Sequence, residues 1–303
     1  MTNAVRLLQD QQLELDKNTD CQQSGFAVLS DWRALLVSGE DAEGFLQNLL
    51  TNDVKAAITG QAQLNGFCQA KGRLLAVFWL VRQADGFLLL LPADQAAFLA
   101  QRLSMFKLRS KVTITAVEDS LLLALPDNRI CPDNTAVIDD SLAIAVINAT
   151  ELENTLAKLQ QAELTQQTRH CWQQAYIRAG YPMIFAASRE RYTAQQVNLD
   201  LAAGVSFRKG CYPGQEVVAR LHYLGEAKRR LFIGEVAVHD LPEAGTDITS
   251  KEGEVAGQLV QGCLLDDGRS LIQMTLKLTM AGQTLFLPGG SEITGVSRLG
   301  GGD

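Results

Sequence analysis

The sequence has 303 residues, of which 47% are hydrophobic and 20% charged, and its formal net charge at pH 7 is −7. This composition is typical of a folded globular protein and excludes a disordered chain or a fibrous repeat. The length exceeds that of one ordinary hydrophobic core, so we expect two or three compact units. The acidic charge argues against a broad phosphate-binding surface, because nonspecific binding to nucleic acid depends on clustered lysine and arginine.

Apolar runs such as 74–81 and 87–91 are far shorter than the roughly 20 residues that cross a bilayer. The first 18 residues lack the regions of a secretion signal, so we expect a cytoplasmic protein without a membrane segment. The six cysteines, at positions 21, 68, 131, 171, 211 and 263, form no Cys-x-x-Cys pair. The sequence therefore predicts neither a disulfide nor a bound metal.

Residues 23–118 are predicted to form a first α+β lobe, after an N-terminal tail over 1–22. The pattern predicts, in chain order, a strand over 26–37, a helix after 38–41, strands over 63–70, 73–82 and 87–91, a helix from Asp94, and a strand over 111–117. This order is typical of a ferredoxin-like layout, in which helices cover one face of an antiparallel sheet.

Residues 119–226 are predicted to form a second ferredoxin-like α+β lobe, and residues 227–303 a C-terminal β-barrel. The second lobe has strands over 121–125 and 142–147 and helices over 151–161 and 169–179. From about Arg229 short apolar runs are broken by glycine, which is typical of a small barrel. The predicted barrel strands cover 231–238, 255–260, 271–278 and 284–287.

The stretch FRKGCYPGQEVVAR, residues 207–220, differs from the rest because core packing does not require its order of residues. If residues 207–211 are extended, Lys209 and Cys211 point the same way, since alternate side chains of a strand share a face. Pro213 suits the first position of a following helix. A lysine ammonium and a helix N-terminus both favour a thiolate at Cys211, whereas Glu216 and burial oppose it.

An unpaired cysteine is most often a small buried hydrophobe, and that interpretation of Cys211 stays open. The surrounding glycines and polar side chains favour a functional site instead. No histidine lies close in sequence to act as a base; His170, His222 and His239 could approach only through the fold. We interpret these three as ordinary surface or core histidines.

Lys-Gly-Cys-Tyr-x-Gly-Gln-Glu, residues 209–216, resembles the signature of the bacterial YgfZ family of folate-binding proteins linked to tRNA modification and iron–sulfur maintenance. Matching segments lie along most of the chain, at 31–32, 38–41, 51–54, 70–73, 110–114, 179–182 and 198–200. The resemblance implies the fold of the glycine cleavage aminomethyltransferase, with two α/β lobes and a C-terminal barrel around a central folate site.

The resemblance implies tetrahydrofolate as the cofactor and assigns two of its contacts to Trp32 and Trp172. It also makes Cys211 the candidate functional thiol and Lys209 its cation. Indole rings suit a flat pterin because they offer stacking area at little conformational cost. Without the resemblance, each tryptophan would be interpreted as ordinary packing, since most tryptophans are well buried.

The chain departs from the aminomethyltransferase at one position. After the Lys-Gly turn the transferase carries an Asp-Asp whose carboxylate works at the folate, whereas this chain has Ala76 and Val77 and no acid over 73–83. Apolar side chains cannot accept a proton, so one-carbon transfer is the alternative and not the first interpretation. A non-catalytic, folate-responsive scaffold is a second alternative, and whether the protein is an enzyme stays open.

Six basic residues lie between 208 and 230: Arg208, Lys209, Arg220, Lys228, Arg229 and Arg230. A solvated face of the protein explains such a run of charges. The glutamate tail of a folate or the phosphates of a tRNA would also suit it. Of these two ligands we favour the folate tail, because the protein as a whole is acidic. The sequence and the resemblance together predict a monomer that binds tetrahydrofolate and supports tRNA modification by maintaining iron–sulfur enzymes, its clients. The resemblance also implies the family's link to the control of replication initiation, which would then be indirect. Direct binding of tRNA is left open.

Overall fold

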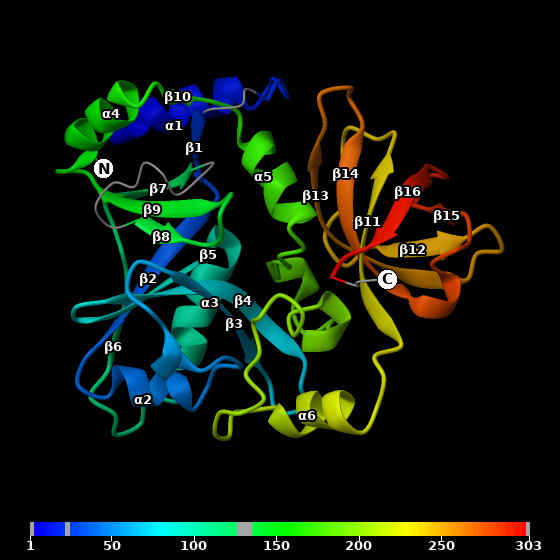
Figure 1. Ribbon diagram of the computed structural model, residues 1–303, viewed down its shortest axis with the longest axis horizontal. Coiled ribbons are helices and arrows are strands. Elements are labelled where there is room, and N and C mark those ends of the chain that lie inside the picture. Colours follow the sequence, from blue (N-terminus) through cyan, green and yellow to red (C-terminus); the bar gives the residue numbers. More distant parts are fainter. Residues whose placement is uncertain (1–2, 22–24, 126–134, 301–303) are drawn as a thin grey trace. The chain divides into compact units, whose positions relative to one another are not determined.

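The structure is a computed structural model that describes residues 3–21, 25–125 and 135–300 (Figure 1). Cys131 lies outside these residues. The chain divides into two compact units: residues 1–46, 54–63 and 78–175 form the first, and residues 47–53, 64–77 and 176–303 form the second. Neither unit is one contiguous stretch, because two short segments of the N-terminal half group with the C-terminal half.

One sheet lies wholly within the first unit (Figure 1). Its spatial order is β10 (Thr165–Gln166), β1 (Gly25–Val28), β7 (Ser120–Leu125), β9 (Ala143–Asn148) and β8 (Thr135–Val137). Neighbouring strands are antiparallel except β1 and β10, which are parallel. Helices α1 (Asn3–Leu15) and α4 (Leu152–Gln161) share a buried apolar core with this sheet.

Helix α1 lies within the segment that the sequence predicts as a tail, and it is packed into the first unit. Val5 is 1% exposed, and the side chain of Gln12 is fully buried. The Gln12 amide accepts a hydrogen bond from the Val28 N–H at 2.7 Å and donates one to the Gln167 carbonyl at 2.9 Å. A glutamine therefore anchors the inner face of α1, which explains why an apolar pattern does not mark this helix.

A second sheet has the order β3 (Ala62–Cys68), β4 (Leu74–Gln83), β5 (Gly86–Pro92), β2 (Trp32–Ser38) and β6 (Thr113–Ala116). Helix α2 (Ala42–Gln47) follows β2, and α3 (Ala93–Ser104) packs on β2, β5 and β6. The prediction of one strand over 26–37 was wrong. A turn at Ser30-Asp31 separates β1 from β2, and the two strands belong to different sheets.

The second unit contains a closed β-barrel, which together with the two sheets confirms the predicted α+β class with a C-terminal barrel. The barrel order is β11 (Arg229–Val236), β14 (Ser270–Lys277), β13 (Val255–Leu264), β12 (Asp247–Ser250), β15 (Leu285–Phe286) and β16 (Glu292–Arg298), and β16 closes it by pairing with β11. The sequence missed β12 and β16, which are short or mostly solvent-facing. No helix in the described part of the chain is long and apolar enough to cross a membrane.

Candidate functional site

Trp32 and Trp172, the two predicted folate contacts, touch each other in the first unit. Trp32 begins β2 and Trp172 lies on α5 (Arg169–Arg178). Their ring centroids are 5.6 Å apart and the rings meet edge to face at 85°. Each side chain is only 6% exposed. The two indoles therefore pack on each other and do not form an open sandwich of two parallel ring faces.

A single guanidinium holds the backbone beside both tryptophans. Nε of Arg169 lies 2.6 Å from the Asp16 carboxylate, and one of its terminal nitrogens lies 2.7 Å from the Asp31 carboxylate. Asp16 also accepts a hydrogen bond from the Arg169 backbone N–H at 2.8 Å. Because Asp31 precedes Trp32 and Arg169 opens the helix that carries Trp172, this network fixes the two rings relative to each other.

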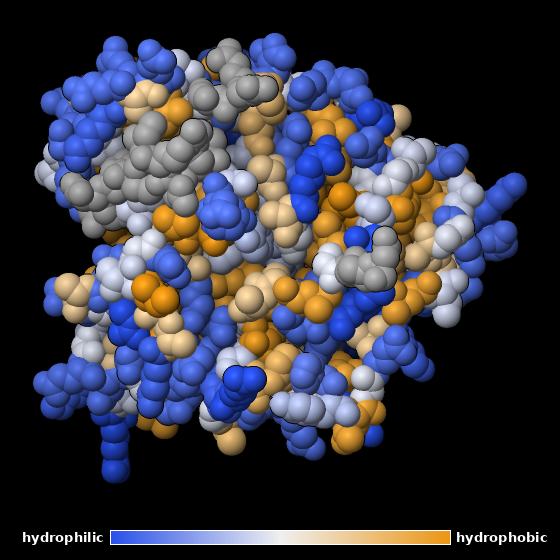
Figure 2. Space-filling model, viewed as in Figure 1, coloured by the Kyte–Doolittle hydropathy of each residue, from blue (hydrophilic) through white to orange (hydrophobic). Residues whose placement is uncertain are grey.

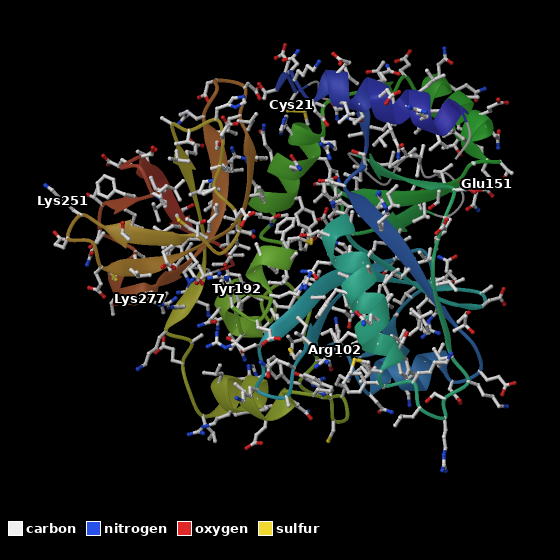
Figure 3. The ribbon with its side chains drawn as sticks, turned by 180° about the vertical axis from the view of Figure 1, so that it is seen from behind. Cys21, Arg102, Glu151, Tyr192, Lys251 and Lys277 are labelled. Carbon is white, nitrogen blue, oxygen red and sulfur yellow. A yellow bond between two sulfur atoms is a disulfide. The ribbon has the colours of Figure 1, made fainter. Side chains whose placement is uncertain are left out.

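A disulfide joins Cys21 to Cys171, the residue before Trp172; Figure 3 labels Cys21. The prediction of no disulfide was therefore wrong. The two cysteines are 150 residues apart in sequence, so no local spacing marks them. The fold brings their Cα atoms to 5.4 Å, which is within bonding geometry. The bond ties the segment after α1 to α5.

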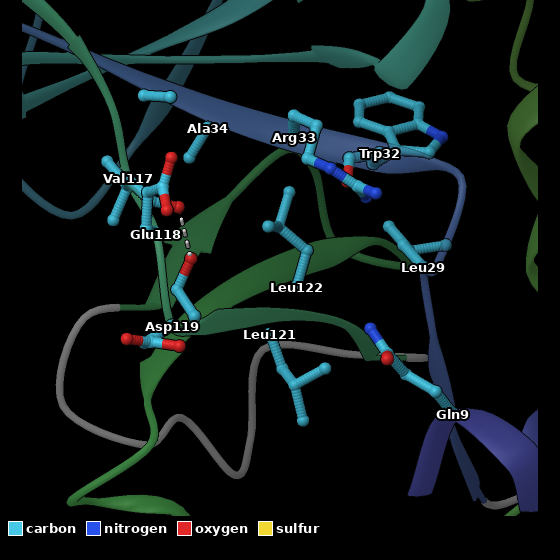
Figure 4. A pocket seen from close by; sticks show the side chains of 12 residues that line it. Gln9, Leu29, Trp32, Arg33, Ala34, Val117, Glu118, Asp119, Leu121 and Leu122 are labelled. Atoms are coloured by element: carbon cyan, nitrogen blue, oxygen red, sulfur yellow. Dashed lines mark hydrogen bonds between the residues drawn. The ribbon is translucent and has the colours of Figure 1, made fainter. Parts of the chain in front are cut away.

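Trp32 also lines a cavity of about 380 Å³ in the first unit (Figure 4). Figure 4 shows Glu118 and Asp119 on one side of it and Leu29 and Gln9 on the other. The volume lies within the range of roughly 300–1,000 Å³ that is usual for small-molecule sites. The two carboxylates suit a ligand that donates hydrogen bonds on that side and disfavour an anionic group there.

Lys209, the first residue of the cysteine motif, is anchored within the second unit. Its Nζ donates hydrogen bonds to the carbonyl oxygens of Gln47 at 2.6 Å, Leu50 at 2.6 Å and Asn52 at 2.9 Å. Gln47 ends α2, so its carbonyl has no partner within the helix. Burial lowers the pKa of Lys209 to about 8, against the opposing charge of Asp53. At neutral pH the ammonium therefore keeps three donors for three acceptors.

The expectation that Lys209 and Cys211 share one face is wrong. Residues 207–209 form a bend and not a strand; Lys209 is 9% exposed, whereas Cys211 is exposed. The convergent carbonyls satisfy the ammonium in the interior, which explains why it is not in solvent beside the thiol. Helix α6 (Gln215–Tyr223) begins after Pro213, with Gly214 as its N-cap.

Cys211 is the exposed member of the three free cysteines in the residues that the structure describes. Cys68 and Cys263 are buried, and burial raises the pKa of each thiol to about 12. Within residues 3–21, 25–125 and 135–300, no group of three or more His, Cys, Asp or Glu side chains could hold a metal ion. Among the described residues, Cys211 is thus the free thiol that a reagent, a metal or a partner can reach from solvent.

Two glycine turns pack against each other next to the motif. Gly72 and Gly214 have φ values of 74° and 83°, a region that favours glycine. A Cβ on Gly214 would lie 2.7 Å from the Gln69 carbonyl oxygen, and one on Gly72 would lie 2.7 Å from the Val217 Cβ. The Lys-Gly turn therefore fits closely against the start of α6. Each turn is visible in the sequence, but their contact has no local signal.

The six basic residues between 208 and 230 do not form one surface. Lys209 is buried, and Arg230 lies 2.8 and 3.0 Å from the two carboxylate oxygens of Asp200. The side chains of Arg230 and Asp200 are 15% and 7% exposed, so this ion pair belongs to the packed structure. Arg208, Arg220 and Lys228 are exposed and Arg229 is half-buried. A charged ligand can therefore reach only part of the run.

The chain is similar along most of its length to proteins of one name. It is 29% identical over 284 residues to tRNA-modifying protein YgfZ of Klebsiella pneumoniae (strain 342), covering 86% of this chain and 87% of the relative. A protein of the same name from Escherichia fergusonii is 28% identical over the same shares. No family model matches the chain. These relatives confirm the resemblance to the YgfZ family.

A solved structure has the same fold. The aminomethyltransferase T of the glycine cleavage system from Bartonella henselae superposes with a TM-score of 0.69, covering 94% of this chain and 87% of that one. The two sequences are 17% identical, so the likeness establishes the fold alone. It confirms the aminomethyltransferase-like fold that the sequence resemblance implies.

Proposed function

We propose that this protein is a cytoplasmic monomer that binds a reduced folate beside Trp32 and Trp172. Through its Cys211 thiol it supports tRNA modification by maintaining iron–sulfur enzymes. The relatives named tRNA-modifying proteins support the tRNA role. The observation that carries the proposal is Cys211 itself, an exposed thiol on a loop that Lys209 anchors, while Cys68 and Cys263 are buried. A fixed, accessible thiol is suited to exchange chemistry or to soft-metal ligation.

The residues around Trp32 fit a tetrahydrofolate. Trp32 borders a cavity large enough for a pterin, and Trp172 supports Trp32 edge-on. The amino and ring N–H groups of a pterin are donors, which Glu118 or Asp119 can accept. The anionic glutamate tail then extends away from those carboxylates. When bound, the folate supplies a carrier of one-carbon units.

We expect Trp32→Phe and Trp172→Phe each to weaken tetrahydrofolate binding about two- to tenfold. Aromatic contacts are worth about 0.5–1.5 kcal/mol beyond their buried area, and phenylalanine retains only part of the contact. Titration of the quenching of intrinsic tryptophan fluorescence measures the affinity. Trp172→Phe acts through the contact of Trp172 with Trp32, and Trp79→Phe is the matched control, because Trp79 is buried in β4 and, unlike Trp32, does not line the cavity. Unchanged affinity in both site variants would remove the folate assignment.

One-carbon transfer by this fold is the alternative function. Where the transferase carries acids, β4 has Ala76 and Val77, which are 0% and 1% exposed. These side chains can neither accept a proton nor contact a solvent-borne substrate. The site therefore favours a folate-responsive role over catalysis of one-carbon transfer.

A further inference from the structure

Three aromatic side chains form an accessible cluster in the second unit that the proposed function does not use. Phe207 stacks on His222 with ring centroids 3.7 Å apart and planes within 12°. Tyr223 meets both rings edge-on, with centroid distances of 6.2 Å to Phe207 and 4.7 Å to His222. His222 is exposed and Tyr223 is 65% exposed. We call these three residues the aromatic platform.

The three rings of the platform contact one another and hang on two fixed points of the chain. His222 and Tyr223 are the last two residues of α6, and Phe207 lies two residues before the anchored Lys209. Figure 1 places α6 at the lower edge of the view. In the same view, Figure 2 shows apolar and weakly polar atoms beside strongly hydrophilic ones at that edge. Because the rings hold one another, a ligand that stacks on them immobilises little additional side-chain freedom.

Basic side chains accompany the platform along the chain. Arg208 follows Phe207, Arg220 lies three residues before Tyr223 and so shares its face of α6, and both arginines are exposed. Apart from the buried Lys209, residues 207–229 contain four basic and two acidic side chains, whereas the whole chain carries a net charge of −7. This excess of positive charge in an acidic protein favours a polyanionic ligand.

We propose that the aromatic platform binds single-stranded RNA, with unpaired bases stacking on His222 and Tyr223 and phosphates lying near Arg208 and Arg220. Stacking platforms flanked by cations are typical of proteins that bind single strands with little sequence preference. The bases of a duplex are already stacked and paired, so a duplex offers the platform no free ring. Tyrosine and arginine are also common at the centres of protein interfaces, but the net positive charge of this segment in an acidic protein favours the polyanion.

This inference goes beyond the proposed function, which needs a folate and a thiol but no direct contact with RNA. Its test uses the purified 303-residue chain, whereas the role of Cys211 is tested in cells. A failure of one therefore leaves the other standing.

The experiment measures fluorescence anisotropy of a fluorescein-labelled 12-nucleotide RNA without self-complementarity, alone or annealed to its complement. We expect the single strand to bind at least fivefold more tightly than the duplex. Tyr223→Ala and His222→Ala should each weaken single-strand binding fivefold or more, the range for loss of one stacked base. Arg220→Ala should flatten the salt dependence, because one phosphate contact is lost.

Phe106→Ala is the matched control, because Phe106 is a 40% exposed aromatic residue of the first unit, and it should bind as the wild type does. Thermal melting verifies that each variant is folded. Equal binding of single strand and duplex, or unchanged binding by both platform variants, overturns the proposal. A wild type that binds no RNA also overturns it. If that wild type self-associates and Tyr223→Ala abolishes the self-association, the platform is a contact between copies of the chain.

Discussion

Lys209→Met is expected to destabilise the protein by about 2–4 kcal/mol, although methionine keeps the apolar stem of the side chain. Three hydrogen bonds from the ammonium to the carbonyls of Gln47, Leu50 and Asn52 disappear. Hydrogen bonds to charged groups contribute about 1.5–3 kcal/mol each, and relief of the cost of burying the ammonium offsets part of the loss. Thermal melting should show a decrease of about 3–6 °C for a protein of this size.

Lys251→Met is the matched control for this substitution. Lys251 is an exposed lysine of the barrel, and its replacement should change stability by no more than about 0.5 kcal/mol. Alkylation of Cys211 by iodoacetamide distinguishes the two roles considered for Lys209. If Lys209 instead stabilised a thiolate, Lys209→Met would slow alkylation at constant pH and leave the melting temperature unchanged. That pattern would contradict the anchoring role.

The sequence predicts best the elements whose own pattern is strong. Strand β4 is apolar along nearly its whole length, and the short apolar runs of β11, β13 and β14 mark the barrel. Strand β16 was missed because only Ile293 of its seven residues is buried, so the strand has no clear apolar face. The turn at Ser30-Asp31 was visible, but its consequence, two strands in two sheets, depends on long-range pairing.

The candidate site follows the same division. Glycines and polar residues around Cys211 indicate an accessible thiol, and the structure leaves Cys211 exposed. The partners of Lys209 lie 157 to 162 residues earlier, so no local argument could find them. The Cys21–Cys171 disulfide spans 150 residues and was missed for the same reason. Residue types predict which side chains can act as a nucleophile or an ion partner, whereas the groups that they contact depend on tertiary structure.

Cys211→Ala is expected to lower the tRNA thiolation that the protein supports at least tenfold. Folding and folate affinity should stay within error of the wild type. The side chain is exposed, so its loss removes little packing; surface substitutions usually change stability by less than about 0.5 kcal/mol. Cys211→Ser should have the same effect, because a hydroxyl of similar size is a far poorer nucleophile and no soft ligand. The measurements are tRNA thiolation in a strain lacking the native gene and thermal melting of each purified variant.

Cys263→Ala is the matched control because it should give the opposite pattern. Its sulfur is buried in the second unit and burial raises the pKa of the thiol to about 12, so it contributes packing but no reactive thiolate. Its loss should lower the melting temperature and leave thiolation per folded molecule intact. Normal thiolation with Cys211→Ala would refute a chemical role for the exposed thiol. A large fall in the melting temperature of the Cys211→Ala variant would instead make Cys211 a packing residue. The exposure of its side chain argues against that interpretation.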